Sequence, residues 1–346
     1  MKKKSSIHTI AKDLGVSATT ISFIINGKAR ENRISDELIS RVEKHLAMID
    51  YKPDVIAQSL RTGKSNLIGM LVEDISDAFF SSIARGVELG FENSGYKILF
   101  MSTKNNSDNA ILILNLLKEH KVDAFIIAPT LGLEDAIQEL IGSGKPVVLY
   151  DRFFPGMHSC NVMIDNRGGA YMGAMELFNN DYRNVAFVTL KSEQVQMTDR
   201  LLGYRDALAQ AGQRKKMVLE IPYNLNTPET ALQIRNFLKK NNDIDGVFFA
   251  TNYLVIAGLQ AIKELGWVIA EDIGVVGFDD HTHFSLFSPS ITAVAQPVPE
   301  IAKAIVRNLR EALAGDKICD PRTVVLPPQL IRRESSSKRI LANMYK

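Results

Sequence analysis

The 346-residue sequence lacks several features that would assign it to a specialised class of protein. Its two cysteines, Cys160 and Cys319, lie far apart and outside any CxxC spacing, so neither a disulfide framework nor a zinc site is expected. No run of about 18 apolar residues occurs, so no membrane-spanning helix is expected. The N-terminus has lysines but no apolar segment of a secretory signal. These absences predict a cytoplasmic protein.

The motifs of several enzyme classes are also missing. "TGKS" (62–65) and "GSGKP" (142–146) resemble phosphate-binding loops, but neither has the earlier glycine of the Walker spacing. No GxGxxG follows a predicted strand, and neither GxSxG nor HExxH occurs. His281 and His283, one residue apart, are weak evidence for a metal site. We therefore expect no enzymatic activity, no cofactor and no bound metal.

Charge is distributed unevenly along the chain. Residues 1–64 contain 12 basic and 7 acidic residues and carry a net charge of +5. The remainder of the chain contains 29 basic and 32 acidic residues and carries a net charge of −3. A basic segment on a mildly acidic body is typical of nucleic-acid binding, although basic tails also bind membranes.

Residues 5–50 are predicted to form three short helices. Apolar residues recur at helical spacing in three sets: Ile7, Ile10, Ala11 and Leu14; Ile21, Ile24 and Ile25; and Leu38, Val42, Leu46 and Ile49. Gly15 suits the left-handed position of a tight turn, and Ser17 and Ser35 suit the N-cap positions of the second and third helices. Two short helices joined in this way match a helix-turn-helix, which places its second helix in the major groove of DNA.

The second predicted helix has two different faces. Its isoleucines at 21, 24 and 25 form an inward stripe. The opposite face carries Ala18, Thr19, Ser22, Phe23 and Asn26. Hydroxyl groups bind phosphates or base edges, while Ala and Phe contact the thymine methyl group. Alternatively, Phe23 packs against the neighbouring loop, and base recognition then depends on Ala18 and Thr19.

The rest of the chain divides into a linker and an α/β region. Residues 51–64 predict only a two-turn helix, which is marginal in water by itself. From Asn66 on, apolar strands alternate with amphipathic helices, which indicates parallel sheets covered on both faces. Strands are predicted at 66–72, 96–102, 123–129, 146–151, 184–189, 245–251 and 273–279, enough for two sheets. Segments 291–297 and 323–335 are predicted crossovers, and the tail after Glu334 is predicted to fray.

Several stretches, in order along the whole chain, resemble the LacI/GalR (lactose-repressor) family of bacterial transcription regulators. They are "IHTIAKDLGVSATTISFIING", "YKPDVIAQSLRTGKSNLIGMLV", "DISDAFF", "VVLYDR", "IDNRGGAYMGAMEL", "DRLLGYRDAL", "DIGVVGFDD" and "PPQLIRRES". The resemblance implies an all-α helix-turn-helix headpiece at 1–50, a hinge helix at 51–64 and a periplasmic-binding-protein-like α/β effector domain. The two parallel-sheet lobes of that domain are expected at 65–164 plus 293–328 and at 165–292 plus 329–340.

The resemblance also implies how such a protein works. It implies a sequence-specific DNA-binding regulator, commonly a repressor, that is a homodimer on a near-palindromic operator and is controlled allosterically by a small ligand between the lobes. The family's hinge leucine, which wedges into the minor groove, matches Leu60, with Ala57 beside it and Arg61 placed to neutralise phosphates. Ser17 opens the recognition helix. The family often has arginine or histidine at the position of Phe23, so a thymine methyl rather than guanine is expected there.

The family's ligand contacts match eleven positions. They are Asp77, Phe79, Phe80, Asp151, Arg152, Asp165, Arg200, Thr251, Asn252, Asp279 and Gln296. Carboxylates and arginines bond vicinal hydroxyls, and aromatic rings cover the apolar face of a sugar. Asp77 and the pair Thr251–Asn252 depart from the usual pattern, and only two arginines are present for a phosphate. A neutral sugar is therefore favoured over a purine or a sugar phosphate. The headpiece argues against a purely periplasmic sugar-binding protein.

Overall fold

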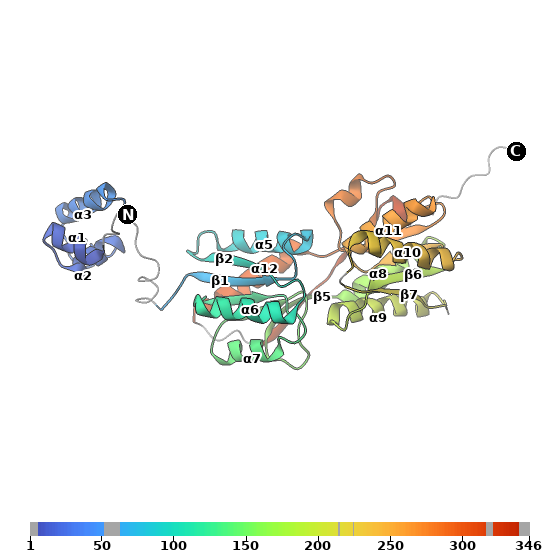
Figure 1. Cartoon of the computed structure of the whole chain (residues 1–346), viewed down its shortest axis with the longest axis horizontal. Helices are drawn as coiled ribbons and strands as arrows, with labels where there is room; N and C mark the ends of the chain where they lie inside the picture. The colour runs from blue at the N-terminus through green and yellow to red at the C-terminus, as the bar shows by residue number, and fades with distance from the viewer. Residues whose placement is uncertain (1–5, 52–62, 214, 224, 316–320, 339–346) are drawn as a thin grey trace. The chain divides into compact units, whose positions relative to one another are not determined.

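The structure is a computed structural model that describes residues 6–51, 63–213, 215–223, 225–315 and 321–338. The chain divides into two compact units, Met1–Ser65 and Asn66–Lys346 (Figure 1). Ala57, Leu60 and Arg61, which the sequence predicts at the DNA minor groove, lie outside the described residues.

The first unit consists of three helices that begin at the predicted caps. They are α1 (Ile7–Leu14), α2 (Ala18–Ile25) and α3 (Asp36–Met48). The side chains of Ser17 and Ser35 cap α2 and α3, and Gly15 ends α1 with a φ of 65°. Because all three capping groups satisfy backbone groups that a helix end leaves unpaired, they set the boundaries. Ile10, Ile21 and Val42, one from each helix, are fully buried between them.

The second unit contains two six-stranded sheets. The first sheet has the order β11-β5-β4-β3-β1-β2 and is parallel throughout. Its strands are β1 (Leu67–Val72), β2 (Lys97–Ser102), β3 (Ala124–Ile127), β4 (Val147–Tyr150), β5 (Cys160–Ile164) and β11 (Arg322–Leu326). The second sheet has the order β12-β10-β9-β8-β6-β7, and only its edge strand β12 is antiparallel. Its strands are β6 (Val185–Leu190), β7 (Met217–Ile221), β8 (Gly246–Phe249), β9 (Gly274–Phe278), β10 (Thr292–Ala295) and β12 (Gln329–Ile331).

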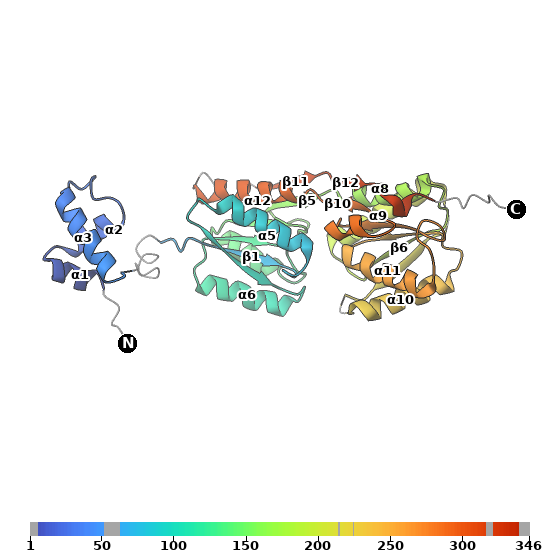
Figure 2. The ribbon, with the colours of Figure 1, turned by 90° about the horizontal axis from the view of Figure 1, so that it is seen from above.

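Helices cover both faces of the first sheet, and together they form what we call the first lobe (Figure 2). Ile68, Met70 and Val72 of β1 belong to the core beneath α5 (Ala78–Phe91) and α12 (Val298–Leu313). Leu71 belongs to a separate core beneath α6 (Ser107–Glu119) and α7 (Glu134–Gly142). Alternate residues of a strand point to opposite faces, so the continuous apolar runs of the sequence supply both cores.

The second sheet and its helices form the second lobe. Helices α8 (Asn166–Asn179) and α9 (Val195–Gln210) pack together on one side, and α10 (Thr227–Lys240) and α11 (Asn252–Leu265) on the other (Figure 2). Two single 3₁₀ turns, Thr282–Leu286 and Glu334–Ser336, complete the described part of this lobe.

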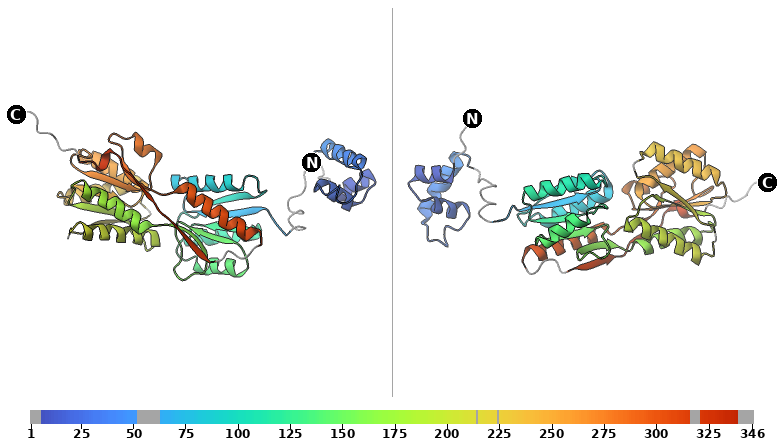
Figure 3. Two further views of the ribbon diagram at one scale, coloured as in Figure 1. Left: turned by 180° about the vertical axis from the view of Figure 1, so that it is seen from behind. Right: turned by 60° about the horizontal axis from the view of Figure 1, so that its bottom comes forward.

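The chain passes between the two lobes three times. It leaves the first sheet after β5 to enter α8, returns after β10 to form α12, and crosses again from β11 to β12. The last crossing is the red segment that joins the lobes in the left panel of Figure 3. Helix α12 is held close to α5, because a Cβ atom added at Gly86 or Gly90 would lie 2.6 Å from Ala302 or 2.5 Å from Val306.

All seven predicted strands are present, and both predicted crossover segments connect the lobes as expected. Strands β5 and β7 were missed. The sequence has no helix between β4 and β5 to mark a new unit, and β7 is an edge strand with the exposed Glu220 in its run. Cys160 of β5 takes part in a disulfide bond, which the cysteine spacing did not predict. The parallel pairing of β5 with β11 brings together segments that are far apart in the sequence.

Two absences concern only the described part of the chain. None of its helices is long and apolar enough to cross a membrane. Its His, Cys, Asp and Glu side chains form no group of three or more that could hold a metal ion.

The predicted fraying after Glu334 is wrong for Ser335 and Ser336, which are fully buried. The Ser335 hydroxyl donates to the carbonyl of Val275 at 2.6 Å and accepts the N–H of Thr292 at 2.8 Å. The C-terminal end of the described chain is thereby bonded to strands β9 and β10.

Ser335→Ala should lower the free energy of unfolding by about 1–3 kcal/mol, because it leaves a buried N–H and a buried carbonyl without partners. Chemical denaturation of the full chain measures the change. Ser337→Ala, two residues further on at an exposed position, is the matched control. Equal stability of the two variants would contradict the structural role of Ser335.

Candidate functional site

The outward face of α2 is the candidate DNA-contacting surface. Thr19 is exposed, and Phe23 is half-buried but lies outside the side chains that form or flank the described headpiece core. Ala18, which the helical wheel placed on the same face, instead packs against that core. Of these three residues, Thr19 and Phe23 are therefore the better placed to contact a partner.

The other polar residues of this surface are partly engaged within the helix. The Ser17 hydroxyl accepts the Thr20 N–H at 3.0 Å, and Asn26 Nδ2 donates to the Ser22 carbonyl at 2.6 Å. The backbone of the turn is supported from α3, since Arg41 donates to the Leu14 carbonyl at 3.0 Å. The first two bonds lie within α2 and its caps, and the third ties α3 to the end of α1.

A cleft of about 400 Å³ lies between the two lobes. Small-molecule sites typically have volumes of roughly 300–1,000 Å³. Its polar residues follow the carboxyl ends of β1, β4, β8, β9 and β10, which is where open parallel sheets bind ligands. Ten of the eleven residues predicted as ligand contacts line it: Asp77, Phe79, Phe80, Asp151, Arg152, Arg200, Thr251, Asn252, Asp279 and Gln296. Their role as ligand contacts stays a prediction.

Asp165 is the exception and a correction. It is exposed and absent from the cleft lining, and its carboxylate caps α8 by accepting the Gly168 N–H at 2.8 Å. The next residue, Asn166, is buried and its Oδ1 accepts a hydrogen bond from Arg200 Nε at 2.9 Å. Within this motif, the side chain that contacts Arg200 is therefore that of Asn166, one residue after Asp165.

Phe79 and Phe80 differ in their surroundings although both border the cleft. Phe80 is 6% exposed and belongs to the first-lobe core, while Phe79 is only partly buried. Their rings meet edge to face with centroids 5.1 Å apart. Phe79 is thus the ring with more surface left to cover a ligand.

Arg200 and Asp279 form a buried ion pair in the second lobe. Arg200 is 2% exposed, and its Nη1 lies 3.1 Å from one Asp279 oxygen while its Nη2 lies 3.3 Å from the other. Its Nη1 also donates to the Ala250 carbonyl at 2.6 Å, and its guanidinium lies 3.6 Å from the ring centroid of Phe278. Gln296 donates to Asp279 at 2.6 Å from the other side. This arrangement fixes Asp279 at the cleft.

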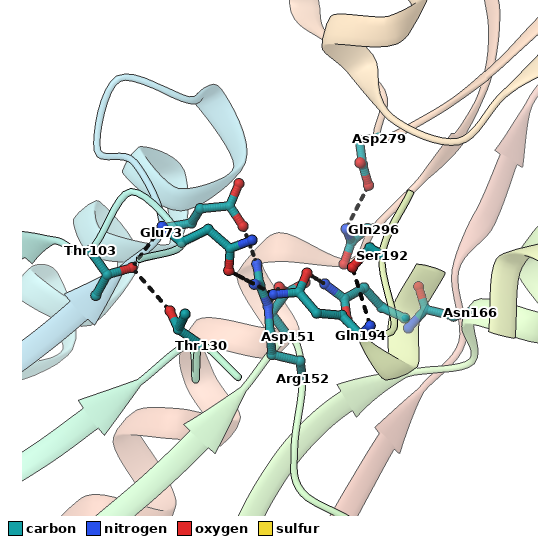
Figure 4. A network of polar contacts seen from close by, with 12 residues as sticks. Glu73, Thr103, Thr130, Asp151, Arg152, Asn166, Ser192, Gln194, Asp279 and Gln296 are labelled. Atoms are coloured by element: carbon teal, nitrogen blue, oxygen red, sulfur yellow. Dashed lines mark hydrogen bonds and ion pairs between the residues drawn. The ribbon is translucent and has the colours of Figure 1, made fainter. Parts of the chain in front are cut away.

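Arg152 organises the facing side of the cleft in the first lobe (Figure 4). It is buried, and it donates to Glu73, to Asp151 at 3.0 Å and to Asn105 at 3.2 Å. Burial alone would lower the pKa of Arg152, but the carboxylates of Asp151 and Glu73 raise it. The guanidinium therefore stays charged and holds two carboxylates at the cleft.

Burial raises the pKa of three cleft carboxyls, Asp77, Asp151 and Asp279. Nearby donors oppose this shift: the Phe79 N–H for Asp77, Arg152 for Asp151 and Arg200 for Asp279.

Asp151 and Asp279 also have φ angles of 66° and 67°. Such left-handed conformations are unfavourable for residues other than glycine and cluster at functional sites.

Among the described residues, three side-chain hydrogen bonds cross the cleft and connect the lobes. Tyr223 donates to Glu73 at 2.5 Å, and Asn252 donates to Asp77 at 3.2 Å. Gln194 donates to the Asn105 oxygen at 2.7 Å. The structure therefore has the two lobes joined by side chains at the mouth of the cleft as well as by the backbone crossings.

Sequence reasoning missed about half of the lining. The missed residues are Glu73, Asp74, Ser76, Leu190, Gln194, Gln196, Met197, Tyr223, Leu225 and Tyr253. Glu73 and Asp74 directly follow β1, so their place at a strand end was a usable signal. Gln194, Gln196 and Tyr223 carried no such signal, because the first two begin a helix and Tyr223 follows the unpredicted strand β7.

Comparisons with known proteins agree with this architecture. Residues 174–336 match the model of a periplasmic binding protein-like domain. The HTH-type transcriptional regulator KdgR of Bacillus subtilis is 30% identical over 341 residues, which cover 97% of this chain and 100% of that protein.

Solved structures share the fold at lower identity. The lac repressor dimer bound to operator and the anti-inducer ONPF has a TM-score of 0.84 at 20% identity, and the match covers 96% of this chain and 99% of that chain. A LacI family regulator from Enterococcus faecium with bound ribose has a TM-score of 0.71 at 24% identity, and the match covers 79% of this chain and 100% of that chain. With the full-length match to a curated regulator, these likenesses show that the chain belongs to the LacI/GalR family of DNA-binding bacterial transcription regulators.

Proposed function

We propose that this regulator is a cytoplasmic, homodimeric repressor whose hold on a near-palindromic operator is controlled by a polyhydroxylated small molecule in the cleft. The headpiece at 1–50 reads the major groove and the linker at 51–64 enters the minor groove through Leu60, as the family resemblance suggests. The lobes at 65–164 plus 293–328 and at 165–292 plus 329–340 then form the effector domain.

The observation that carries this proposal is the composition of the cleft. Polar side chains from the carboxyl ends of both sheets meet there, and aromatic surface lies beside them at Phe79 and Tyr253. Hydroxyl groups suit such carboxylates and amides as partners, and rings suit the apolar face of a sugar. The relatives agree with a small ligand, since one solved neighbour contains ribose and another an anti-inducer.

The cross-cleft hydrogen bonds suggest how a ligand would act. A molecule that contacts both lobes replaces or reinforces the bonds of Tyr223, Gln194 and Asn252, and so changes the angle between the lobes. In a dimer, that angle sets the spacing of the two linkers on DNA. A ligand shifts this equilibrium only by its differential affinity for the two states, typically about 1–3 kcal/mol.

Replacing Phe23 should change operator sequence preference. We expect sites selected from random DNA to favour thymine opposite Phe23, because a ring contacts the thymine methyl but cannot pair with guanine. Phe23→Ala should weaken that preference by about 1 kcal/mol. Met48→Ala, which alters an exposed residue at the end of α3, is the control. Strong guanine preference that survives Phe23→Ala would contradict the assignment.

Removing Arg200 should abolish the response to effector. Arg200→Ala leaves Asp279 without its partner at the cleft, so we expect the ligand-dependent change in operator affinity to disappear while operator binding itself remains. Fluorescence anisotropy with labelled operator, with and without a ligand found by thermal-shift screening of sugars, sugar phosphates and nucleobases, measures both quantities. Arg167→Ala removes an exposed pair with Asp206 and should respond normally. A normal response of Arg200→Ala would show that the cleft is not the effector site.

A further inference from the structure

The cleft contains more negative than positive charge. Its described lining has the carboxylates of Glu73, Asp74, Asp77, Asp151 and Asp279. The only cations of that lining are the guanidinium groups of Arg152 and Arg200. The lining thus has a formal excess of three negative charges, in a place where burial already raises the pKa of three of the carboxyls.

Neither arginine offers an uncompensated positive charge to a ligand. All three nitrogens of Arg152 donate to side chains, and two of the acceptors are the carboxylates of Glu73 and Asp151. All three nitrogens of Arg200 donate as well, and its charge is matched by Asp279. An anionic ligand would therefore add charge to an electronegative cleft and find both guanidinium groups already paired.

The orientation of the neighbouring amides follows from Arg152. A guanidinium only donates, so the Asn105 atom beside it is Oδ1, and this oxygen also accepts from Gln194 Nε2 at 2.7 Å. The Oε1 of Gln194 then accepts from Gln196 Nε2 at 3.2 Å. The chain of amides ends at Gln196 Oε1. Gln196 is 3% exposed and lines the cleft, and no described group donates to this oxygen.

A second acceptor at the cleft is also unused. Arg152 takes one oxygen of Asp151, and among the described residues no hydrogen bond reaches the other, Oδ1, although the side chain is only 8% exposed. Buried polar atoms are normally paired, and an unpaired one needs an explanation. Of the two oxygens, only Gln196 Oε1 is fully buried without a partner, while Asp151 Oδ1 belongs to a residue that lines the cleft. Both are acceptors, so a ligand group that bonds them has to be a donor.

We propose that the ligand is a polyhydroxylated compound bearing an ammonium group, an amino sugar in chemical class, and that the cleft discriminates against sugars bearing phosphate or carboxylate. This inference rests on the proposed effector role of the cleft. The ammonium group supplies three donors and a positive charge, which complement the buried acceptor Gln196 Oε1, the cleft-lining Asp151 carboxylate and the excess of carboxylates. The hydroxyl groups supply donors to the remaining amides and carboxylates.

Matched sugars test the proposal on the full-length protein. Thermal-shift and calorimetric titrations would compare glucose, glucosamine, glucuronate and glucose 6-phosphate, and the corresponding galactose and mannose series. For at least one skeleton we expect the amino sugar to bind about tenfold more tightly than its neutral parent, a difference of about 1.4 kcal/mol. The anionic members should bind more weakly than both.

Charge variants show whether the preference comes from the cleft. Asp151→Asn keeps the shape of the side chain and the bond to Arg152 but removes one charge, so the preference for the amino sugar over its neutral parent should fall. Gln196→Met removes the orphaned acceptor at similar volume and should weaken binding of the amino sugar. Asp206→Asn, at an exposed carboxylate outside the cleft lining, should leave both affinities unchanged.

The outcomes separate the two proposals. Tighter binding of an anionic or neutral sugar than of its amino counterpart would overturn the ligand class and leave the effector role of the cleft standing. The same holds if Asp151→Asn leaves the preference unchanged. Absence of any binding across the whole series at millimolar concentration would overturn the ligand class and the proposed control by a polyhydroxylated molecule together.

Discussion

The effector unit depends on the three passages of its chain between two parallel sheets. Each passage enters and leaves near the carboxyl ends of strands, so the polar loops of both lobes meet at one cleft. The same passages attach the lobes to each other through three short segments of backbone. Hinge motions concentrate dihedral changes in a few connecting residues, which here are the short segments after β5, β10 and β11.

Two buried arginines determine the polar character of that cleft, one in each lobe. Arg200 aligns Asp279 and Asn166, while Arg152 aligns Glu73, Asp151 and, through Asn105, a row of amides that reaches the other lobe. A buried guanidinium is stable only with its charge and donors matched. Each arginine therefore pairs with carboxylate oxygens that could otherwise bind a ligand. The groups that remain available to a ligand in the cleft are mainly acceptor oxygens.

The sequence was sufficient to predict the headpiece and most of the α/β order. Capping serines, Gly15 and helical spacing are local signals, and the structure has the three helices where those signals predict them. Strand β5 escaped prediction because no helix separates it from β4, and local pattern carries no information about its pairing with β11, which lies far away in the sequence. Strand β7 escaped prediction because it is an edge strand whose run contains the exposed Glu220.

The sequence predicted the candidate site best at residues that belong to the stretches resembling the LacI/GalR family. Arg152, Arg200 and Asp279 belong to such motifs and lie at the cleft. The prediction for Asp165 missed the inward-facing residue by one position. Asp165 caps α8 and the adjacent Asn166 contacts Arg200, and a polar side chain suits both positions. Gln196 and Tyr223 line the cleft because of the way α9 and β7 approach the first lobe. The spacing of residues in the sequence does not predict that arrangement.

The close contact of α12 with Gly86 and Gly90 of α5 has a consequence for biosynthesis. Strands β1 to β5 and helix α5 leave the ribosome early, but the helix that covers α5 is made only after the whole α8–β10 region has been synthesised. The glycine-bearing side of α5, and the part of the first-lobe core that α12 completes, therefore stay uncovered while the second lobe emerges. Because exposed apolar surface in incomplete chains promotes aggregation, the order of synthesis leaves the first lobe open to association until α12 has been made.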